Sequence, residues 1–274
     1  MSITVTRDIV LEIERIEAAA WRDMHDSATA EDRAALGLRS REVAGALVLA
    51  MDSSDSLLQN RVLGLGLHSP VTDGVLEVLR EHYRAHVHGF AINLCPNAEP
   101  SGVEEMLAKR GFGTFFHHLK WVRDAAPAPA PTGTLRVEIV PATQAQVWAE
   151  LAARSFESPP AHATWSARLI GRRGWSHYWA WADNAPIAVA AVYVNDGAAW
   201  LGGAATLESH RRLGAQGALF ARRVADALQQ GARWLTAETA PDWPDLPGDS
   251  LRNAARAGFH PAYERPSWIW PIPS

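Results

Sequence analysis

An alternating Ala-Pro segment, from Asp124 to Gly133, constrains the fold of this chain more than any other feature. Repeated Ala-Pro steps favour extended polyproline geometry, which forms a semi-rigid spacer between folded parts. The segment lies near the middle of the 274 residues, so each side has an ordinary domain size. We therefore predict two domains, residues 1–124 and 135–274, joined by a linker over residues 125–134.

Each half carries the same order of predicted elements. In the first half, apolar spacing predicts a strand at 61–67, a helix at 71–84, a strand at 90–95 and a helix at 101–109. In the second half it predicts a strand at 199–207, a helix at 215–230, a strand at 233–238 and a helix at 250–256. Both series end in Gly-Phe, at Gly111-Phe112 and Gly258-Phe259. The order indicates a duplicated α/β unit with a mixed sheet.

The segments before each series add further expected elements. They are helices at 8–26 and 144–156, strands at 43–51 and 134–140, and a strand pair at 178–181 and 187–194 that turns at Asp183-Asn184. Ser101, with Glu104 three residues later, has the pattern of a capping box for the helix at 101–109.

Composition excludes several classes of protein. The net charge of −4 is too small to indicate a nucleic-acid or membrane partner. Cys95 is the only cysteine, which excludes a disulfide framework within the chain. No secretory signal or long apolar run is visible, and His117-His118 lack a third residue spaced to complete a metal site. We expect a cytoplasmic protein without a metal, either a monomer or a homodimer.

The turn between the strand at 199–207 and the helix at 215–230 predicts an anion site. The first N–H groups of a helix have no internal acceptor and carry partial positive charge. Small residues let a ligand approach this backbone and two arginines add cationic donors, namely Gly214, Ala215, Gly217, Ala218, Arg211 and Arg212. The turn lacks both the Walker P-loop and the Gly-x-Gly-x-x-Gly fingerprint. It suits a diphosphate, with a basic surface turn as the alternative.

The same segment resembles the cofactor motif of the GCN5-related N-acetyltransferase (GNAT) family. That motif is Arg/Gln-x-x-Gly-x-Gly/Ala between a strand and a long helix, and it is matched here by Arg211, Arg212, Leu213, Gly214, Ala215 and Gln216. Gln216 departs from the motif, but Gly217-Ala218 follow at once, as in some members. The helix at 250–256 resembles a second family element, in which Asn253 and neighbours such as Arg256 face the pantetheine arm.

The resemblance implies a tandem protein with two GNAT-like domains, each a splayed mixed β-sheet flanked by helices. It implies acetyl-CoA as cofactor, with Thr206 and Leu207 at the pantetheine and thioester. In the first half the matching turn, His68 to Gly74, has no arginine pair and carries Asp73 where a diphosphate would be repelled. We therefore predict a degenerate N-terminal copy and a cofactor site only in residues 135–274.

Three residues are candidates for proton transfer. Glu238, at the end of the strand at 233–238, is the first candidate for the base that accepts the proton of the amine, and Glu208 is the second. The family's usual acid, a Tyr four residues before the Gly of Gly-Phe, is replaced by Ala254. Tyr263 is the substitute that the sequence offers.

The acceptor is the least constrained part of the prediction. Six tryptophans are candidates to line a cleft between the domains, with a Trp-rich core as the alternative, namely Trp165, Trp175, Trp179, Trp181, Trp200 and Trp243. A lined cleft favours a small amine with an apolar or aromatic part, such as an amino acid or drug-like amine. A protein amine, a longer acyl group, or a catalytically weak CoA-binding module on the same fold remain open.

Overall fold

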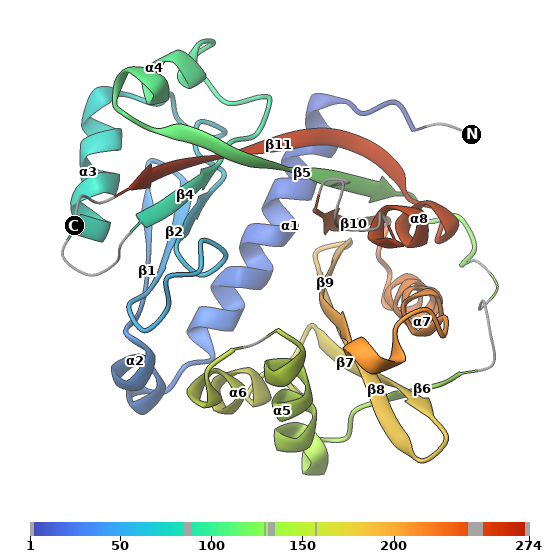
Figure 1. The fold of residues 1–274 in the computed structure, drawn as a ribbon. Coiled ribbons are helices and arrows are strands. Elements are labelled where there is room, and N and C mark those ends of the chain that lie inside the picture. The colour runs from blue at the N-terminus through green and yellow to red at the C-terminus, as the bar shows by residue number, and fades with distance from the viewer. Residues whose placement is uncertain are drawn as a thin grey trace. The chain divides into compact units, whose positions relative to one another are not determined.

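The computed structural model describes residues 3–84, 89–128, 130, 135–156, 158–240 and 249–271, and the chain divides into two units (Figure 1). The C-terminal unit contains Met1–Val5 and Lys120–Ala262, and the N-terminal unit contains Thr6–Leu119 and Tyr263–Ser274. Strands β5 (Gly113–Arg123) and β11 (His260–Pro271) each begin in one unit and end in the other. The predicted domain limits of 1–124 and 135–274 stay a prediction, since the units of the structure exchange these two strand ends.

The N-terminal unit has four helices and four strands of its own among the described residues. They are α1 (Arg7–Asp26), α2 (Ala30–Leu36), β1 (Leu38–Val43), β2 (Ala46–Met51), β3 (Arg61–Leu63), α3 (Asp73–Arg84), β4 (Gly89–Asn93) and α4 (Val103–Lys109). The strand order is β1-β2-β3-β4-β11, with β3 and β4 parallel and the other pairs antiparallel. The core behind α3 and α4 is aliphatic and aromatic, because α3 buries Leu76, Leu79 and Tyr83 at helical spacing.

The C-terminal unit has the second series of elements. They are β6 (Arg136–Ile139), α5 (Ala145–Ser155), α6 (Pro160–Ala167), β7 (Trp175–Ala182), β8 (Ala185–Asn195), β9 (Ala198–Thr206), α7 (Ala215–Gln229), β10 (Trp234–Thr239) and α8 (Asp249–Arg256), with short 3₁₀ turns η1 (Ala142–Gln144) and η2 (Glu208–His210). The strand order is β5-β10-β9-β8-β7-β6. Only β9 and β10 are described as a parallel pair in this unit.

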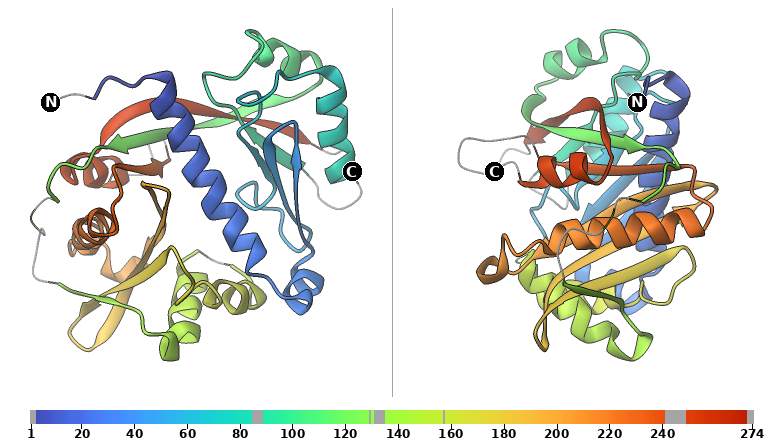
Figure 2. Two further views of the ribbon diagram at one scale, coloured as in Figure 1. Left: turned by 180° about the vertical axis from the view of Figure 1, so that it is seen from behind. Right: turned by 90° about the vertical axis from the view of Figure 1, so that its right-hand side faces the viewer.

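Helices cover both faces of the C-terminal sheet. Helix α7 packs on β7, β8 and β9 (Figure 2), and the Tyr178 hydroxyl donates to its Asp226 at 2.9 Å. The next residue of β7, Trp179, packs in the cluster formed by α5 and α6. Successive strand residues point to opposite faces, so α7 and the α5–α6 pair lie on opposite faces of this sheet.

The predicted duplication is confirmed, because β3-α3-β4-α4 in one half matches β9-α7-β10-α8 in the other. The two second helices even end alike. The N–H of Phe112 donates to the Leu107 carbonyl, and that of Phe259 donates to the Ala254 carbonyl, at 3.1 Å in both cases. The following β5 and β11, and helices α2 and α6, are elements that the sequence patterns missed.

Two local predictions are wrong. The strand predicted at 43–51 forms only from Ala46, as β2; Val43 ends β1, and Ala44 and Gly45, with φ of 51° and 80°, form a two-residue hairpin turn between the strands. The capping box at Ser101 does not form, because Gly102 is the N-cap of α4 and no side chain caps it.

The tryptophan side chains mostly form core. Trp165 is fully buried, and Trp175, Trp179 and Trp200 are no more than 8% exposed. Trp243 lies outside the described residues, and Trp181 is half-buried beneath the guanidinium of Arg136. The Trp-rich core, one of the two alternatives, therefore accounts for these four residues.

Candidate functional site

The parallel pair β9 and β10 separates at one end. Their pairing runs from Ala198 and Trp234 to Leu201 and Ala237. Strand β9 continues to Thr206 and β10 to Thr239, without further pairing between them over these described residues. The separated ends leave strand edges that an extended ligand can join by backbone hydrogen bonds.

A β-bulge redirects β9 at this point. Gly202 lies opposite Ala191 and Ala205 lies opposite Val189, so β9 has one residue more than β8 between these pairs. Gly203, within the bulge, has a φ of 57°, a left-handed conformation that favours glycine. The Gly202-Gly203 step is thus the local reason that β9 bends away from its parallel neighbour.

A buried arginine of α7 holds the bulge. The Nη1 of Arg223 donates to the Ala191 carbonyl at 3.2 Å and to the Gly202 carbonyl at 3.4 Å, and its side chain is 1% exposed. Burial lowers the pKa of Arg223 to about 10, so the guanidinium remains a cation at neutral pH. Helix α7 is therefore tied to the carbonyls of the residue pair that borders the bulge on one side.

The backbone N–H groups of the two predicted residues, Thr206 at the end of β9 and Leu207 just after it, differ in their partners. The N–H of Leu207 donates to the Ile187 carbonyl of β8 at 2.9 Å. Successive N–H groups of a strand point in opposite directions, so the N–H of Thr206 faces away from β8, towards the separated edge. Because the Leu207 N–H is engaged within the protein, any backbone N–H contact from this pair falls to Thr206, and the assignment of both residues to the ligand stays a prediction.

The turn before α7 leaves the helix start without a side-chain cap. Gly214 is the N-cap with a φ of 87°, and Arg212 before it has a φ of 66°. Arg211, Arg212, Leu213 and Gly214 are exposed. The 15-residue helix then presents the N–H groups of its first turn, for which helix geometry provides no acceptor. These residues fit a diphosphate.

Gln216, which departs from the family motif, has a structural role. Its Nε2 donates to the Thr206 hydroxyl at 2.9 Å. The side chain thereby connects the first turn of α7 to the strand end that carries the available amide. The next two residues, Gly217 and Ala218, have no side chain or a small one, and Ala218 is buried.

Helix α8 is the second predicted family element, the one that carries Asn253 and Arg256. Asn253 is half-buried and Arg256 is exposed. Ala254, at the family's tyrosine position, is fully buried, so no acid group stands there. The guanidinium of Arg123 at the end of β5 donates to the Ala257 carbonyl at 3.1 Å and thereby caps the helix.

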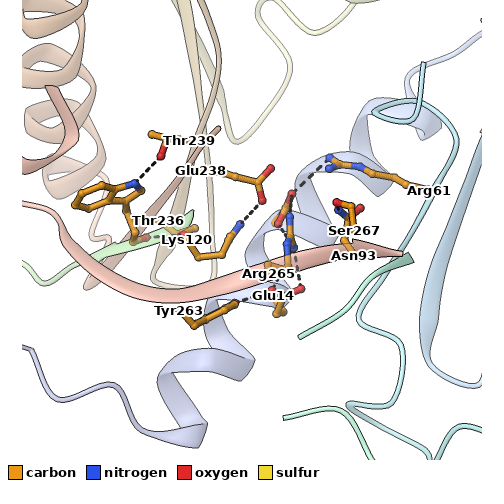
Figure 3. A network of polar contacts seen from close by, with 12 residues as sticks. Glu14, Arg61, Asn93, Lys120, Thr236, Glu238, Thr239, Tyr263, Arg265 and Ser267 are labelled. Atoms are coloured by element: carbon orange, nitrogen blue, oxygen red, sulfur yellow. Dashed lines mark hydrogen bonds and ion pairs between the residues drawn. The ribbon is translucent and has the colours of Figure 1, made fainter. Parts of the chain in front are cut away.

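Glu238 follows directly after the last residue of β10 that pairs with β9. Its side chain is 14% exposed, and its Oε2 lies 3.6 Å from the Nζ of Lys120, which is fully buried on β5 (Figure 3). An adjacent ammonium favours the ionised carboxylate. The first candidate base is therefore partly buried and faces a lysine that the sequence analysis missed.

The other two proton-transfer candidates have different surroundings. The Glu208 side chain is 88% exposed, with the Arg211 guanidinium 3.8 Å away. Tyr263 belongs to the N-terminal unit, where its hydroxyl donates to the Glu14 carboxylate at 2.6 Å. Burial, together with the charge of Glu14, raises the pKa of Tyr263. A phenol so held is a poor proton donor.

The equivalent helix start in the N-terminal unit is closed by the chain itself. The Thr72 hydroxyl accepts from the Val75 N–H at 3.3 Å, and Asp73 pairs with Arg110 at 2.7 Å. Beside it, the N–H of Glu99 donates to the Gly66 carbonyl at 2.9 Å. In this unit a side chain therefore caps the helix start, and a backbone hydrogen bond engages the chain that follows β3.

The residues missed by the sequence analysis are Lys120, Arg223 and the bulge at Gly203. Adjacent glycines inside a strand are a signal for a bulge. Lys120 is one of only two lysines among the 26 lysine and arginine residues, and it stands in an aromatic strand. Its partner, 118 residues later, could be found only in the folded chain.

Solved structures share this fold. A GCN5-related N-acetyltransferase from Kribbella flavida matches with a TM-score of 0.65 and 18% identity, covering 95% of both chains. One from Sphaerobacter thermophilus has a TM-score of 0.63 and 16% identity, covering 100% of this chain and 96% of that one. A tandem GNAT protein from the clavulanic acid biosynthesis pathway has a TM-score of 0.55 and 20% identity, covering 78% and 75%.

These comparisons establish the class of the fold. The chain has the GNAT fold in tandem arrangement, as predicted from its two motifs and its repeated element order. No protein-family model and no curated protein matches the sequence.

The described residues contain neither a metal-binding cluster nor a membrane-spanning helix. No cluster of three or more His, Cys, Asp or Glu side chains in this part of the chain is placed to hold a metal ion. None of the helices described has the length and apolar character needed to cross a membrane.

Proposed function

We propose that this protein transfers an acetyl group from acetyl-CoA to the amine of a small molecule. One observation carries the proposal. The separated edge of β9 and the uncapped, glycine-containing start of α7 meet at a single site in the C-terminal unit. An extended arm with a diphosphate suits both features at once.

Different residues of the chain bind the different parts of acetyl-CoA. The first N–H groups of α7, at Ala215, Gln216 and Gly217, bind the diphosphate, and Arg211 and Arg212 add charge from the exposed turn. The β9 edge binds the pantetheine arm, with Asn253 and Arg256 of α8 as further contacts. Acetyl-CoA supplies an activated acetyl thioester when it is bound.

The transfer needs one proton acceptor and one hydrogen-bond donor. Glu238 accepts a proton from the ammonium of the acceptor, directly or through one water, and leaves a neutral amine. The amine nitrogen attacks the thioester carbonyl, so that a C–N bond forms as the C–S bond breaks. The Thr206 N–H donates to the carbonyl oxygen as negative charge develops there. The thiolate that leaves would take up the proton that the attacking nitrogen loses, or one from water.

A second candidate function is a CoA-binding module with weak or no turnover. It is favoured by the lack of an acid at Ala254 and by the engagement of the Tyr263 hydroxyl with Glu14. The identity of the amine, the cytoplasmic location and the monomeric or homodimeric state stay predictions.

Thermal unfolding with and without acetyl-CoA tests the cofactor. Binding to the folded state alone raises the melting temperature, by the equivalent of about 2.7 kcal/mol at a concentration 100 times Kd. A panel of amines, including phenylalanine, tryptamine and spermidine, then tests transfer by release of free thiol. No shift at millimolar acetyl-CoA contradicts both candidate functions, whereas a shift without thiol release favours the binding module.

Glu238→Gln tests the assigned base. Because the amide keeps the shape of the carboxylate but cannot accept the proton, we expect kcat to fall by about 100-fold or more. The thermal shift caused by acetyl-CoA should stay, since Glu238 takes no part in binding the diphosphate. An unchanged kcat would assign the base elsewhere.

A further inference from the structure

Lys120 is a charged side chain without access to water. Its side chain is 0% exposed, whereas the other lysine of the chain, Lys109, is 79% exposed. Removing an ammonium from water costs several kcal/mol unless a partner compensates for it. The Glu238 carboxylate, at 3.6 Å, is an oppositely charged partner.

The two side chains of the ion pair differ in exposure and in their distance along the sheet from β9. Glu238 is 14% exposed and stands at the point where β9 and β10 separate. Lys120 lies on β5, the strand on the other side of β10 from β9. The lysine is therefore fully buried on the strand that does not border β9, whereas the carboxylate keeps some exposure.

The neighbouring residues fix the register of β5 against β10. The Trp121 Nε1 donates to the Thr239 hydroxyl, and the Thr236 hydroxyl donates to the Trp121 carbonyl, both at 2.9 Å (Figure 3). All of these groups are buried. A shift of β5 by one residue would point Lys120 to the other face of the sheet, so these two bonds also fix the ion pair.

We infer that Lys120 is a positioning residue for Glu238, supplied to the C-terminal unit by the half of the chain that precedes the linker. The inference rests on the proposed function. Lys120 holds the carboxylate in a fixed position at the point where β9 and β10 separate, and it touches neither amine nor thioester. The N-terminal half thereby contributes to transfer without binding acetyl-CoA itself.

The ion pair can be tested without changing Lys120. The sequence has two lysines, so a chain labelled with ¹⁵N at lysine Nζ gives two lysine signals, which Lys109→Arg assigns. We expect Glu238→Gln to shift the Lys120 signal and to leave the Lys109 signal in place. A Lys120 signal that is insensitive to Glu238→Gln overturns the inference.

The catalytic role is tested by a double-mutant cycle with the full chain and the panel amine that turns over fastest. We expect Lys120→Met to lower kcat by about 10- to 100-fold, with the KM for acetyl-CoA changed by less than about threefold. Lys120→Met combined with Glu238→Gln should be no more than about threefold slower than Glu238→Gln alone, because both changes remove one function. Effects that multiply, or a kcat unaffected by Lys120→Met, overturn the inference.

The matched control is Lys109→Met, which removes an exposed lysine 3.9 Å from Glu105 on α4 and should leave kcat unchanged. Failure of the proposed function is distinguishable. If acetyl-CoA binds but no amine turns over, the positioning role falls with it, and the NMR result then assigns the pair to stability alone. If turnover occurs and the cycle shows no coupling, only the role of Lys120 is lost.

Discussion

Helices α3 and α7 occupy equivalent positions in the two halves, yet their N-termini differ in what they offer a ligand. The start of α3 is capped by the Thr72 hydroxyl and carries the Asp73 carboxylate, which is paired with Arg110. The start of α7 has a left-handed glycine as N-cap and no side-chain cap. The same element can therefore be closed by two polar side chains or left open by one glycine.

The ends of the equivalent strands β3 and β9 also differ, one being hydrogen-bonded to its own chain and the other left open. Beyond β3, the Gly66 carbonyl accepts from the Glu99 N–H at 2.9 Å, and a Cβ added at Gly66 would lie 2.9 Å from Ala98 and Glu99. Beyond Leu201, β9 bends at a bulge that Arg223 holds in place. The comparison teaches that a duplicated fold can keep its architecture while one copy closes a strand edge with its own backbone and the other leaves it open.

Of the changes that test this difference between α3 and α7, Gly214→Val should have the largest effect on acetyl-CoA affinity. A branched side chain at a φ of 87° strains the turn and stands where a diphosphate approaches, so we expect acetyl-CoA affinity to fall by at least about 100-fold. The loss of the thermal shift measures it. Gly102→Val is the control, because Gly102 is the N-cap of α4 with a φ of 90°.

Both valine variants carry a similar backbone strain, about 1–2 kcal/mol for a left-handed residue. Their melting temperatures without ligand should therefore fall alike, while Gly102→Val keeps the shift with acetyl-CoA. A Gly214→Val variant that still binds would place the diphosphate elsewhere.

Gly217→Asp introduces a carboxylate into the first turn of α7, as Asp73 does in α3. A carboxylate in the first turn of a helix stabilises that helix by about 0.3–1 kcal/mol, but it repels a diphosphate. We expect a slightly higher melting temperature without ligand and an acetyl-CoA affinity lower by about tenfold or more. Gly217→Asn has a similar volume without the charge, so equal losses in both variants would exclude an electrostatic cause.

Thr206→Val should have the smallest effect of the three. It removes the acceptor of the Gln216 hydrogen bond, which is worth about 0.5–1.5 kcal/mol, so affinity should fall by about 2- to 10-fold. Thr206→Ser keeps a hydroxyl and should retain most of the affinity in a calorimetric titration. Gln216→Ala should reduce affinity less in the Thr206→Val background than in the unmodified protein. If the reduction is the same in both backgrounds, the two side chains do not act together.

Much of the fold and of the cofactor turn could be predicted from the sequence. Helix α7 was expected at 215–230 and observed at Ala215–Gln229, because apolar residues and a following Gly231 mark it locally. The β1–β2 hairpin was missed because its turn is Ala44-Gly45, which lacks the Asn-Gly or Asp-Gly signal of such turns. The sequence position of Tyr263 gives no sign of its hydrogen-bond partner, Glu14, which lies 249 residues away.

The sequence by itself determined the two halves, their repeated element order and the open helix start, since spacing, caps and glycines act over a few residues. The tertiary structure decided which strand completes which unit. It joined β5 to β10 and β11 to β4, and so delivered a fully buried cation with each strand, Lys120 to Glu238 and Arg265 to Glu14 and Glu17. No local pattern encodes these pairings, because a buried charge takes its partner from whatever the completed fold brings within reach.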